Sequence, residues 1–375
     1  MSEILDITEL RDSIRSVLID RAGDSIEVPG EEGRGLDHDL WQEMASLGWL
    51  GLIIPEEHGG LGLGLSHLAV LYEELGRDLA SVPVLPTMLA AAAIAAYGNE
   101  AVQAQWLSRI AAGECLAAVK LLDDFAVPEL SIENRVDGII DHVVFADVAT
   151  LLLIPVRTGS ATALALIDPS AAGVTVTQRP VVDLTRSVGR IALDSVAIDS
   201  TTLLVLDERQ WNLLADHAAM GLACDSVGGA AALLDRTVDY LKIREQFGRP
   251  IGSFQALKHR AADWKVKIEA ATALARHAAS LVEAGTGDAT AVASGVKAYA
   301  CDTYAAFCGD AVQLHGGIGF TWEHPCHLFL KRAKLSQQIF GSPTWHKDRA
   351  AQFSFEREVG ATCPEAMPAS PLQMA

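Results

Sequence analysis

An arginine and a phenylalanine stand close together in a turn that could hold a phosphate-bearing ligand. Residues 244–251 read Arg-Glu-Gln-Phe-Gly-Arg-Pro-Ile and follow a long helical pattern. A helix that ends near Arg244 and a glycine–proline turn after it would project Arg244 and Phe247 from one short segment. The guanidinium would be a bidentate partner for phosphate, and the ring would offer a face to an adenine. A surface corner between two helices explains the same residues, so spacing alone leaves both interpretations open.

A second candidate segment comes at the end of another helical pattern, and its residues are Gln313, Leu314, His315, Gly316 and Gly317. Small residues after a helix end let a phosphate-bearing ligand approach the backbone amides. An ordinary glycine cap would account for one of the two glycines equally well. We expect His315 to pack or to donate a hydrogen bond rather than to act as an acid or base.

Changes of periodicity along the chain predict the domains that position these segments. Residues 1–115 show apolar positions at helical spacing, and residues 116–206 break into short β-type runs separated by Gly, Asp and Pro. Residues 207–358 return to long helical patterns, and the proline-containing stretch 359–375 is predicted to be a flexible tail. The predicted class is therefore α+β: an N-terminal α domain, a middle β domain and a C-terminal four-helix bundle.

Charge and composition exclude several classes of function. A net charge of −19 argues against a nucleic-acid partner, which would need a basic surface. No apolar run approaches the roughly 18 residues that a membrane span requires, and the acidic amino terminus lacks the pattern of a signal or transit peptide, so a cytoplasmic location is expected. The six cysteines show no metal-ligand spacing, and no metal site is predicted.

The two segments, together with Gln255, resemble the acyl-CoA dehydrogenase family. The order Arg-x-Gln-Phe-Gly-x-Pro-Ile, with Phe-Gln a few residues later, matches that family's signature at almost every position. The resemblance implies the three-domain fold given above and FAD as cofactor. It also implies that Arg244, Phe247, Gln255 and residues 313–317 contact the adenosine and pyrophosphate of an FAD whose flavin ring lies in a neighbouring subunit.

The same resemblance exposes two catalytic positions that carry the wrong residue. The family removes the α-proton of an acyl thioester with a glutamate found at one of two places, and these correspond here to Phe340 and Ala218. Neither side chain can take a proton. Asp216 and His217 are near in sequence, but a shift of one or two residues turns a helical side chain by roughly 100° or 200°. Neither would replace the glutamate without a change of register.

The middle domain also departs from the family. Residues 120–125, Lys-Leu-Leu-Asp-Asp-Phe, stand where the family has a Thr-Glu-Pro loop beside the flavin ring. Residues 140–145 represent only weakly the strand that covers the ring. We therefore expect that this chain does not hold a whole flavin by itself.

Taken together, the resemblance is to the non-catalytic subunit of heteromeric α2β2 acyl-CoA dehydrogenases of bacterial steroid side-chain degradation. It implies a paralogous partner that supplies the glutamate and most of the acyl-CoA site, and an electron-transfer flavoprotein or similar acceptor. Two alternatives stay open. One is a self-sufficient homotetrameric dehydrogenase or oxidase in which Asp216 or another carboxylate serves as base, and the other is an inert scaffold subunit.

Overall fold

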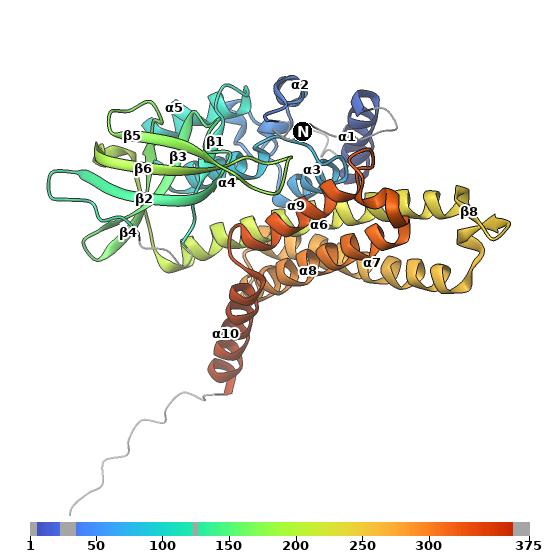
Figure 1. Cartoon of the computed structure of the whole chain (residues 1–375). Coiled ribbons are helices and arrows are strands. Elements are labelled where there is room, and N and C mark those ends of the chain that lie inside the picture. Colours follow the sequence, from blue (N-terminus) through green and yellow to red (C-terminus); the bar gives the residue numbers. More distant parts are fainter. Residues whose placement is uncertain (1–5, 23–34, 123–126, 363–375) are drawn as a thin grey trace, which may run out of the picture.

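The computed structural model describes residues 6–22, 35–122 and 127–362 of the 375-residue chain. Helices of the N-terminal part lie beside a strand-rich middle part, and long helices of the C-terminal part run beneath both (Figure 1). The N-terminal helices are α1 (Ile7–Ala22), α2 (His38–Ser46), α3 (Leu65–Arg77), α4 (Val84–Tyr97) and α5 (Glu100–Ala111).

Side-chain caps and burial explain where these short helices form. The carboxylate of Asp37 accepts a hydrogen bond from the backbone N–H of Leu40, and Asn99 caps α5 in the same way through Val102. Helix α4 is alanine-rich and buried along most of its length, so tertiary packing rather than an amphipathic pattern holds it.

The middle part consists of two sheets. One has the strand order β1 (Ala117–Val119), β3 (Leu151–Thr158), β4 (Ala161–Ile167) and β7 (Leu203–Leu206). The other has the order β2 (Arg135–Val144), β6 (Val188–Ala197) and β5 (Val174–Arg179). Only the β1–β3 pair is parallel among the described strands.

Strand β3 is buried on both faces, and alternate residues enter different cores. Leu152 and Ile154 pack between the two sheets, whereas Leu151 and Leu153 pack against the N-terminal helices. The same division holds along β4. The first sheet is thus a shared wall that fixes the middle part against the rest of the protein.

The C-terminal part contains α6 (Glu208–Ile243), α7 (Gln255–Ala284), α8 (Ala289–His315), α9 (Cys326–Gln338) and α10 (Pro343–Thr362). A capping box of Asp207 and Gln210 starts α6. Helices α6, α7 and α8 pack on one another, and α3 also packs on α6, so the bundle is continuous with the N-terminal helices.

The expected fold class is confirmed, and the long helices lie where their periodicity predicts them. The described C-terminal part has five helices rather than the four of the predicted bundle, and the last two, α9 and α10, form where helical patterns are present in the sequence and both pack on α8. Helix α10 continues to Thr362, so the first residues of the predicted flexible tail are helical, and the remainder lies outside the described residues.

Helix α6 is the one described helix whose length and apolar composition would suit a membrane span. Its apolar window is 94% buried inside the protein, as expected for the central helix of a bundle. All five described cysteines are buried as free thiols: Cys115, Cys224, Cys301, Cys308 and Cys326.

Candidate functional site

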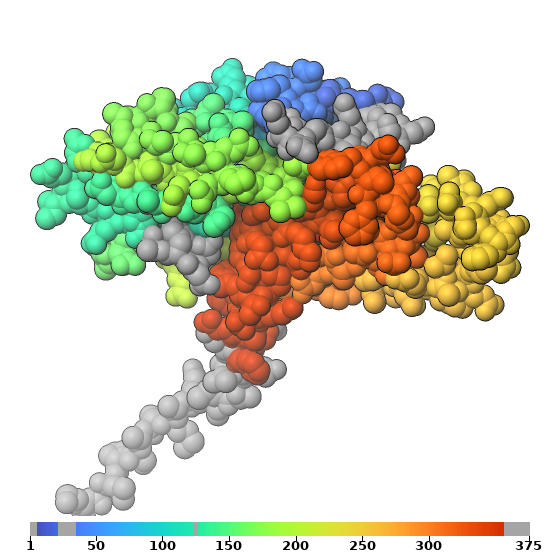
Figure 2. All heavy atoms as spheres, viewed as in Figure 1, coloured from blue at the N-terminus to red at the C-terminus, as the bar shows by residue number. Residues whose placement is uncertain are grey.

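The first predicted segment forms the outer end of the α6–α7 pair. Arg244 ends α6, and the two-residue strands β8 (Glu245–Gln246) and β9 (Arg249–Pro250) form a hairpin that projects from the bundle (Figures 1 and 2). Phe247 occupies the turn with a positive φ of 55° and is 91% exposed. Gln255 is exposed at the first position of α7.

The second segment lies at the same end of the bundle. The ring of His315 stacks on Tyr240, one turn before Arg244, with 4.7 Å between ring centroids. Helices α7 and α8 run antiparallel, and Asp310 accepts hydrogen bonds from Trp264 Nε1 at 2.7 Å and Arg260 Nε at 3.1 Å. Gln255 precedes Arg260 by five residues and His315 follows Asp310 by five, so the two segments approach each other.

The exposed groups at this end fit the phosphate-bearing half of a dinucleotide. Arg244 has no ion-pair partner within residues 6–22, 35–122 and 127–362, so its guanidinium is available. A Cβ added at Gly316 or Gly317 would meet nothing within 4 Å, and Gly316 has a φ of +64°. The backbone here is open to a ligand, which is the arrangement that phosphate binding requires.

Two residues of the second segment point away from solvent. Leu314 and His315 are buried, whereas Gln313 is exposed. Only the backbone of Leu314 could therefore reach a ligand at the surface. His315 Nδ1 lies 2.8 Å from the carbonyl oxygen of Ala311, which agrees with the predicted hydrogen-bonding role.

His315 also belongs to a group that the spacing of the cysteines did not indicate. Candidate ligand atoms of His315, His324 and Cys326 lie within 4.8 Å of one another. Cys326 Sγ is 3.4 Å from His315 Nδ1, and burial raises the pKa of this thiol to about 12. The three side chains form a polar cluster between the end of α8 and the start of α9, and Tyr240 covers one side of it.

The two positions expected to carry glutamate both belong to the apolar interior. Phe340, in the turn after α9, packs against buried Phe145 and Leu222. Ala215 and Gly221 of α6 line small spaces together with Phe340, and Ala218 lies between them on the same helical face and is fully buried. The side chains at the two positions where the resemblance places the glutamate are thus an aromatic ring and a methyl group, and neither can accept a proton.

Asp216 points to another part of the molecule. It is fully buried, and it accepts hydrogen bonds from Arg349 Nη1 of α10 and Thr290 Oγ1, each at 2.7 Å. Burial raises the pKa of Asp216, while the neighbouring guanidinium opposes that rise. Its oxygens are engaged in a buried ion pair, so the geometry does not favour the relocated base.

His217 is equally enclosed. Its Nε2 lies 3.1 Å from the hydroxyl of Tyr72, and burial lowers the pKa of His217 to about 4. The ring is therefore neutral near pH 7 and serves as a core hydrogen-bonding group.

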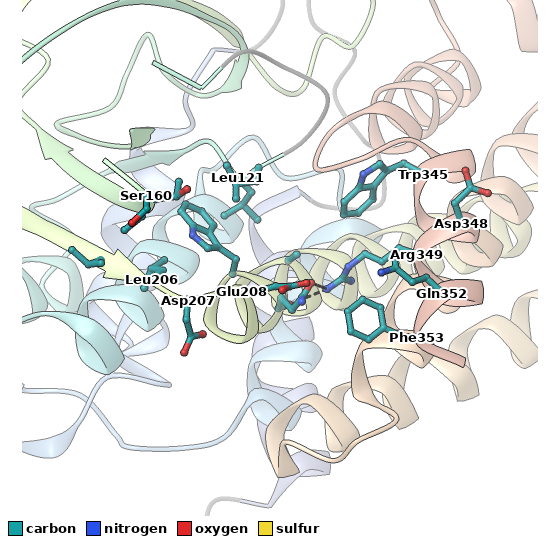
Figure 3. A pocket seen from close by; sticks show the side chains of 17 residues that line it. Leu121, Ser160, Leu206, Asp207, Glu208, Trp345, Asp348, Arg349, Gln352 and Phe353 are labelled. Carbon is teal, nitrogen blue, oxygen red and sulfur yellow. Dashed lines mark hydrogen bonds between the residues drawn. The ribbon is translucent and has the colours of Figure 1, made fainter. Parts of the chain in front are cut away.

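A large cavity that the sequence did not indicate lies on the other side of Arg349. It is open to solvent and has a volume of about 750 Å³, and it is lined by the start of α6, helix α10, the edge formed by β4 and β7, and residues 121–122 (Figure 3). Trp345, Arg349 and Phe353 face it from α10, and Asp207 and Glu208 from the start of α6. The lining residues come from four separate stretches of the chain, 121–122, 160–162, 205–215 and 345–353, so no local motif could have revealed the cavity.

The region expected to hold a flavin ring is only partly described. Residues 123–125 lie outside the described residues. His142 has a φ of 61° and Phe145 a φ of 58°, and the register of β2 shifts between Ile140 and Val143. Val144 and Phe145 consequently turn inward and are buried against Ile339.

Two sequence models of one family match the chain, one on each side of the middle part. The acyl-CoA dehydrogenase N-terminal domain matches residues 6–114, and the acyl-CoA dehydrogenase C-terminal domain matches residues 211–354. The chain is 37% identical to the acyl-CoA dehydrogenase IpdE2 of Mycobacterium tuberculosis over 89% of this chain and 92% of the relative. The chain belongs to the acyl-CoA dehydrogenase family.

Two solved structures of paired proteins are similar to the whole chain. A variant of the Tcur3481-Tcur3483 steroid ACAD has a TM-score of 0.84 and 30% identity, covering 94% of this chain and 98% of that one. The ChsE4-ChsE5 complex from Mycobacterium tuberculosis has a TM-score of 0.83 and 26% identity, covering 96% of this chain and 100% of that one.

Proposed function

We propose that this chain is the subunit of an FAD-dependent acyl-CoA dehydrogenase that lacks the catalytic carboxylate, and that a paralogous partner supplies it. The observation that supports the proposal is that Phe340 and Ala218, at the two positions expected to carry a glutamate, both pack in the apolar interior and neither can accept a proton. Asp225 is the one carboxylate among the described residues that line the space beside Phe340 and Gly221, and Arg186 and Arg332 hold it as an ion pair. No free base faces that space in this part of the chain.

The proposed contribution of this chain is to hold the adenosine and pyrophosphate of a shared FAD. When bound, FAD would accept the hydride that leaves Cβ of the acyl thioester. Arg244 would neutralise pyrophosphate charge, Phe247 would offer its exposed ring to the adenine, and Gln255 would donate or accept a hydrogen bond. Gln313 and the open backbone at Gly316 and Gly317 would complete this part of the site.

The pairing with an unlike subunit is supported by the two similar structures, Tcur3481-Tcur3483 and the ChsE4-ChsE5 complex, since each pairs two differently named proteins. An α2β2 assembly would then carry one FAD at each unlike-subunit interface. The partner would provide the glutamate, the loop beside the flavin ring and the acyl cavity. Electrons would pass to an electron-transfer flavoprotein or a similar acceptor.

For the substrate, we propose the CoA thioester of a steroid-derived acid. The similar structure described as a steroid ACAD supports this class. Loss of one of two acyl sites would leave volume at the interface for a bulky polycyclic group. Finding two flavins in each unlike pair would contradict that explanation.

The flavin content of the purified protein tests the proposal. The chain would be purified alone and after co-expression with a paralogue that retains the glutamate. We expect a colourless chain alone, and about half an FAD per chain in the complex because two unlike subunits share each site. A chain that is yellow alone, with a full complement of FAD, and that is bleached by an acyl-CoA would instead establish a self-sufficient enzyme. A complex without any gain in dehydrogenase activity would establish a scaffold.

A further inference from the structure

Three hollows of very different size meet at the turn after α9. An open cleft of about 680 Å³ lies between the middle part and this turn, with Lys120, His142 and Gln338 among its lining residues. A space of about 30 Å³ lies inside, between α3, α4 and α6, and another of about 20 Å³ lies beside β1. Ile339 and Phe340 line all three. The side chains of these two residues therefore separate the surface cleft from the interior.

The larger interior space has apolar walls. Leu75, Val82, Leu85 and Val144 line it with the ring of Tyr72. Its polar members are already satisfied, since Asp225 pairs with Arg186 Nη2 at 2.7 Å and with Arg332 Nη2 at 2.5 Å. These walls suit an apolar group and not a charged one, and the space of about 30 Å³ holds no acyl chain while the ring of Phe340 is in place.

The backbone of the turn is held in place from two sides. Phe340 has a φ of 53°, which is uncommon for an aromatic residue, and Gly341 has a φ of 99°. His346 Nε2 donates to the carbonyl oxygen of Phe340 at 2.9 Å. The fully buried Lys297 donates through Nζ to the carbonyl oxygens of Gln337, at 3.0 Å, and Gly341. The ring of Phe340 is thus fixed between the cleft and the interior.

We propose that Phe340 is a specificity-determining plug, which excludes the acyl chain of a thioester from the interior of this chain. The inference deepens the proposed function, because the ligand class is the acyl-CoA that function requires. Removal of the ring would join the open cleft to the apolar space around Tyr72 and Gly221 and would add the volume of the ring to it. The partner subunit would then no longer be the only place in the complex where the acyl group can be buried.

Binding of octanoyl-CoA and of free CoA to the full-length chain tests the plug. Isothermal titration calorimetry would compare wild type, Phe340→Gly and Phe340→Leu. Glycine accepts the positive φ of this position, whereas leucine fills most of the space of the ring. We expect wild type and Phe340→Leu to show no preference between the two ligands. Phe340→Gly should bind octanoyl-CoA about tenfold or more tightly than CoA, because several methylenes become buried.

A second comparison separates a plug from an ordinary core residue. Phe329 is fully buried in α9 and lines none of the three hollows, so Phe329→Ala creates a cavity without joining it to the cleft. It should show no preference for octanoyl-CoA. If Phe340→Gly fails to fold by circular dichroism, Phe340→Ala provides a second opening. The inference is overturned if a folded Phe340→Gly or Phe340→Ala variant binds octanoyl-CoA no more tightly than CoA. It is also overturned if wild type already prefers octanoyl-CoA.

The outcome is independent of the test of the shared flavin. If the chain is colourless alone and the Phe340→Gly variant shows no preference for octanoyl-CoA, the proposed function stands and the inference about Phe340 is wrong. A yellow, self-sufficient chain whose wild type prefers octanoyl-CoA would remove both.

Discussion

Asp216 shows how a single residue can look catalytic in sequence and be structural in space. Its carboxylate balances Arg349 inside the protein. In the complex with a partner, Asp216→Asn should change kcat by less than about twofold, whereas the free energy of unfolding should fall by on the order of 3 kcal/mol because Arg349 loses its anion. Turnover and chemical denaturation would be measured on the same samples. Thr290→Val, which removes only the second hydrogen bond, is the matched control. Loss of turnover at unchanged stability would favour the self-sufficient enzyme.

His217 should make stability depend on pH. Its pKa is lowered from 6.5 to about 4 by burial, so the unfolded chain binds the proton first as pH falls. The contribution of neutral His217 to the free energy of unfolding is therefore fully present above about pH 6.5 and is lost progressively as the pH falls to about 4. When the pH is lowered from about 7 to about 5, the free energy of unfolding measured in urea should fall by about 2 kcal/mol more in wild type than in His217→Gln. The control is His259→Gln, at an exposed position, which should lose as much stability as wild type. An equal pH-dependent loss of stability in His217→Gln and His259→Gln would contradict the assignment.

At the scale of elements, Arg332 of α9 joins all three parts of the chain. Its Nη1 donates to the carbonyl oxygen of Ala80 after α3, at 3.1 Å, and to Thr185 Oγ1 of the middle part, at 2.9 Å. Its Nη2 pairs with Asp225 of α6. Burial alone would raise the pKa of Asp225, but Arg186 and Arg332 beside it lower that pKa instead. The carboxylate therefore stays charged and holds two guanidinium groups together.

Removal of this carboxylate should destabilise the whole assembly of elements. Asp225→Asn leaves Arg186 and Arg332 buried with one less negative charge, and we expect a loss of about 3–5 kcal/mol in the free energy of unfolding. Asp235→Asn breaks the exposed pair with Arg77 and should cost less than about 1 kcal/mol. Guanidinium denaturation of both variants gives the comparison. Similar losses would mean that the buried cluster contributes no more than a surface ion pair.

The elements also show how far sequence reasoning reaches. Long helices such as α6, α7 and α8 follow from periodicity, because each buries one face over many turns. The pairing of Arg332 with Asp225, 107 residues apart, does not, because it depends on how α6 and α9 pack. Asp216 was an open candidate for the same reason. Arg349, which donates a hydrogen bond to it, lies on α10, and helical spacing alone cannot reveal that contact.

At the scale of the whole molecule, the segments proposed to bind FAD and the interior behind Phe340 lie in different parts of the bundle. Phe340 packs against the middle part, whereas Arg244 and Phe247 project from the far end of α6 (Figure 1). Such a separation suits the proposed role, in which this chain binds one end of FAD and another chain supplies the catalytic residues. The resemblance predicts the segments that contact FAD and the two replaced glutamates, whereas the closed interior depends on how the turn after α9 packs against α6 and the middle part, which spacing in the sequence cannot reveal.

Substitution of Arg244 in this chain should weaken FAD binding to the complex. A charge-assisted hydrogen bond to phosphate contributes about 1.5–3 kcal/mol, so Arg244→Gln should raise the Kd for FAD by about tenfold to a hundredfold. Fluorescence titration of the deflavinated complex would measure it. Arg249→Gln, in the same hairpin but stacked over Phe254 at 4.1 Å, is the control and should have a smaller effect. Unchanged affinity for Arg244→Gln would place the pyrophosphate elsewhere.

The burial of every described cysteine has a practical consequence for observing assembly. Native thiols in this part of the chain are shielded from maleimide reagents. Cys363 lies outside the described residues and would first be replaced. A cysteine engineered at the exposed Glu245 would then be the thiol that a maleimide reaches, because the five described native cysteines are buried. A fluorophore attached there would report directly when the exposed hairpin docks on another chain, and at what protein concentration.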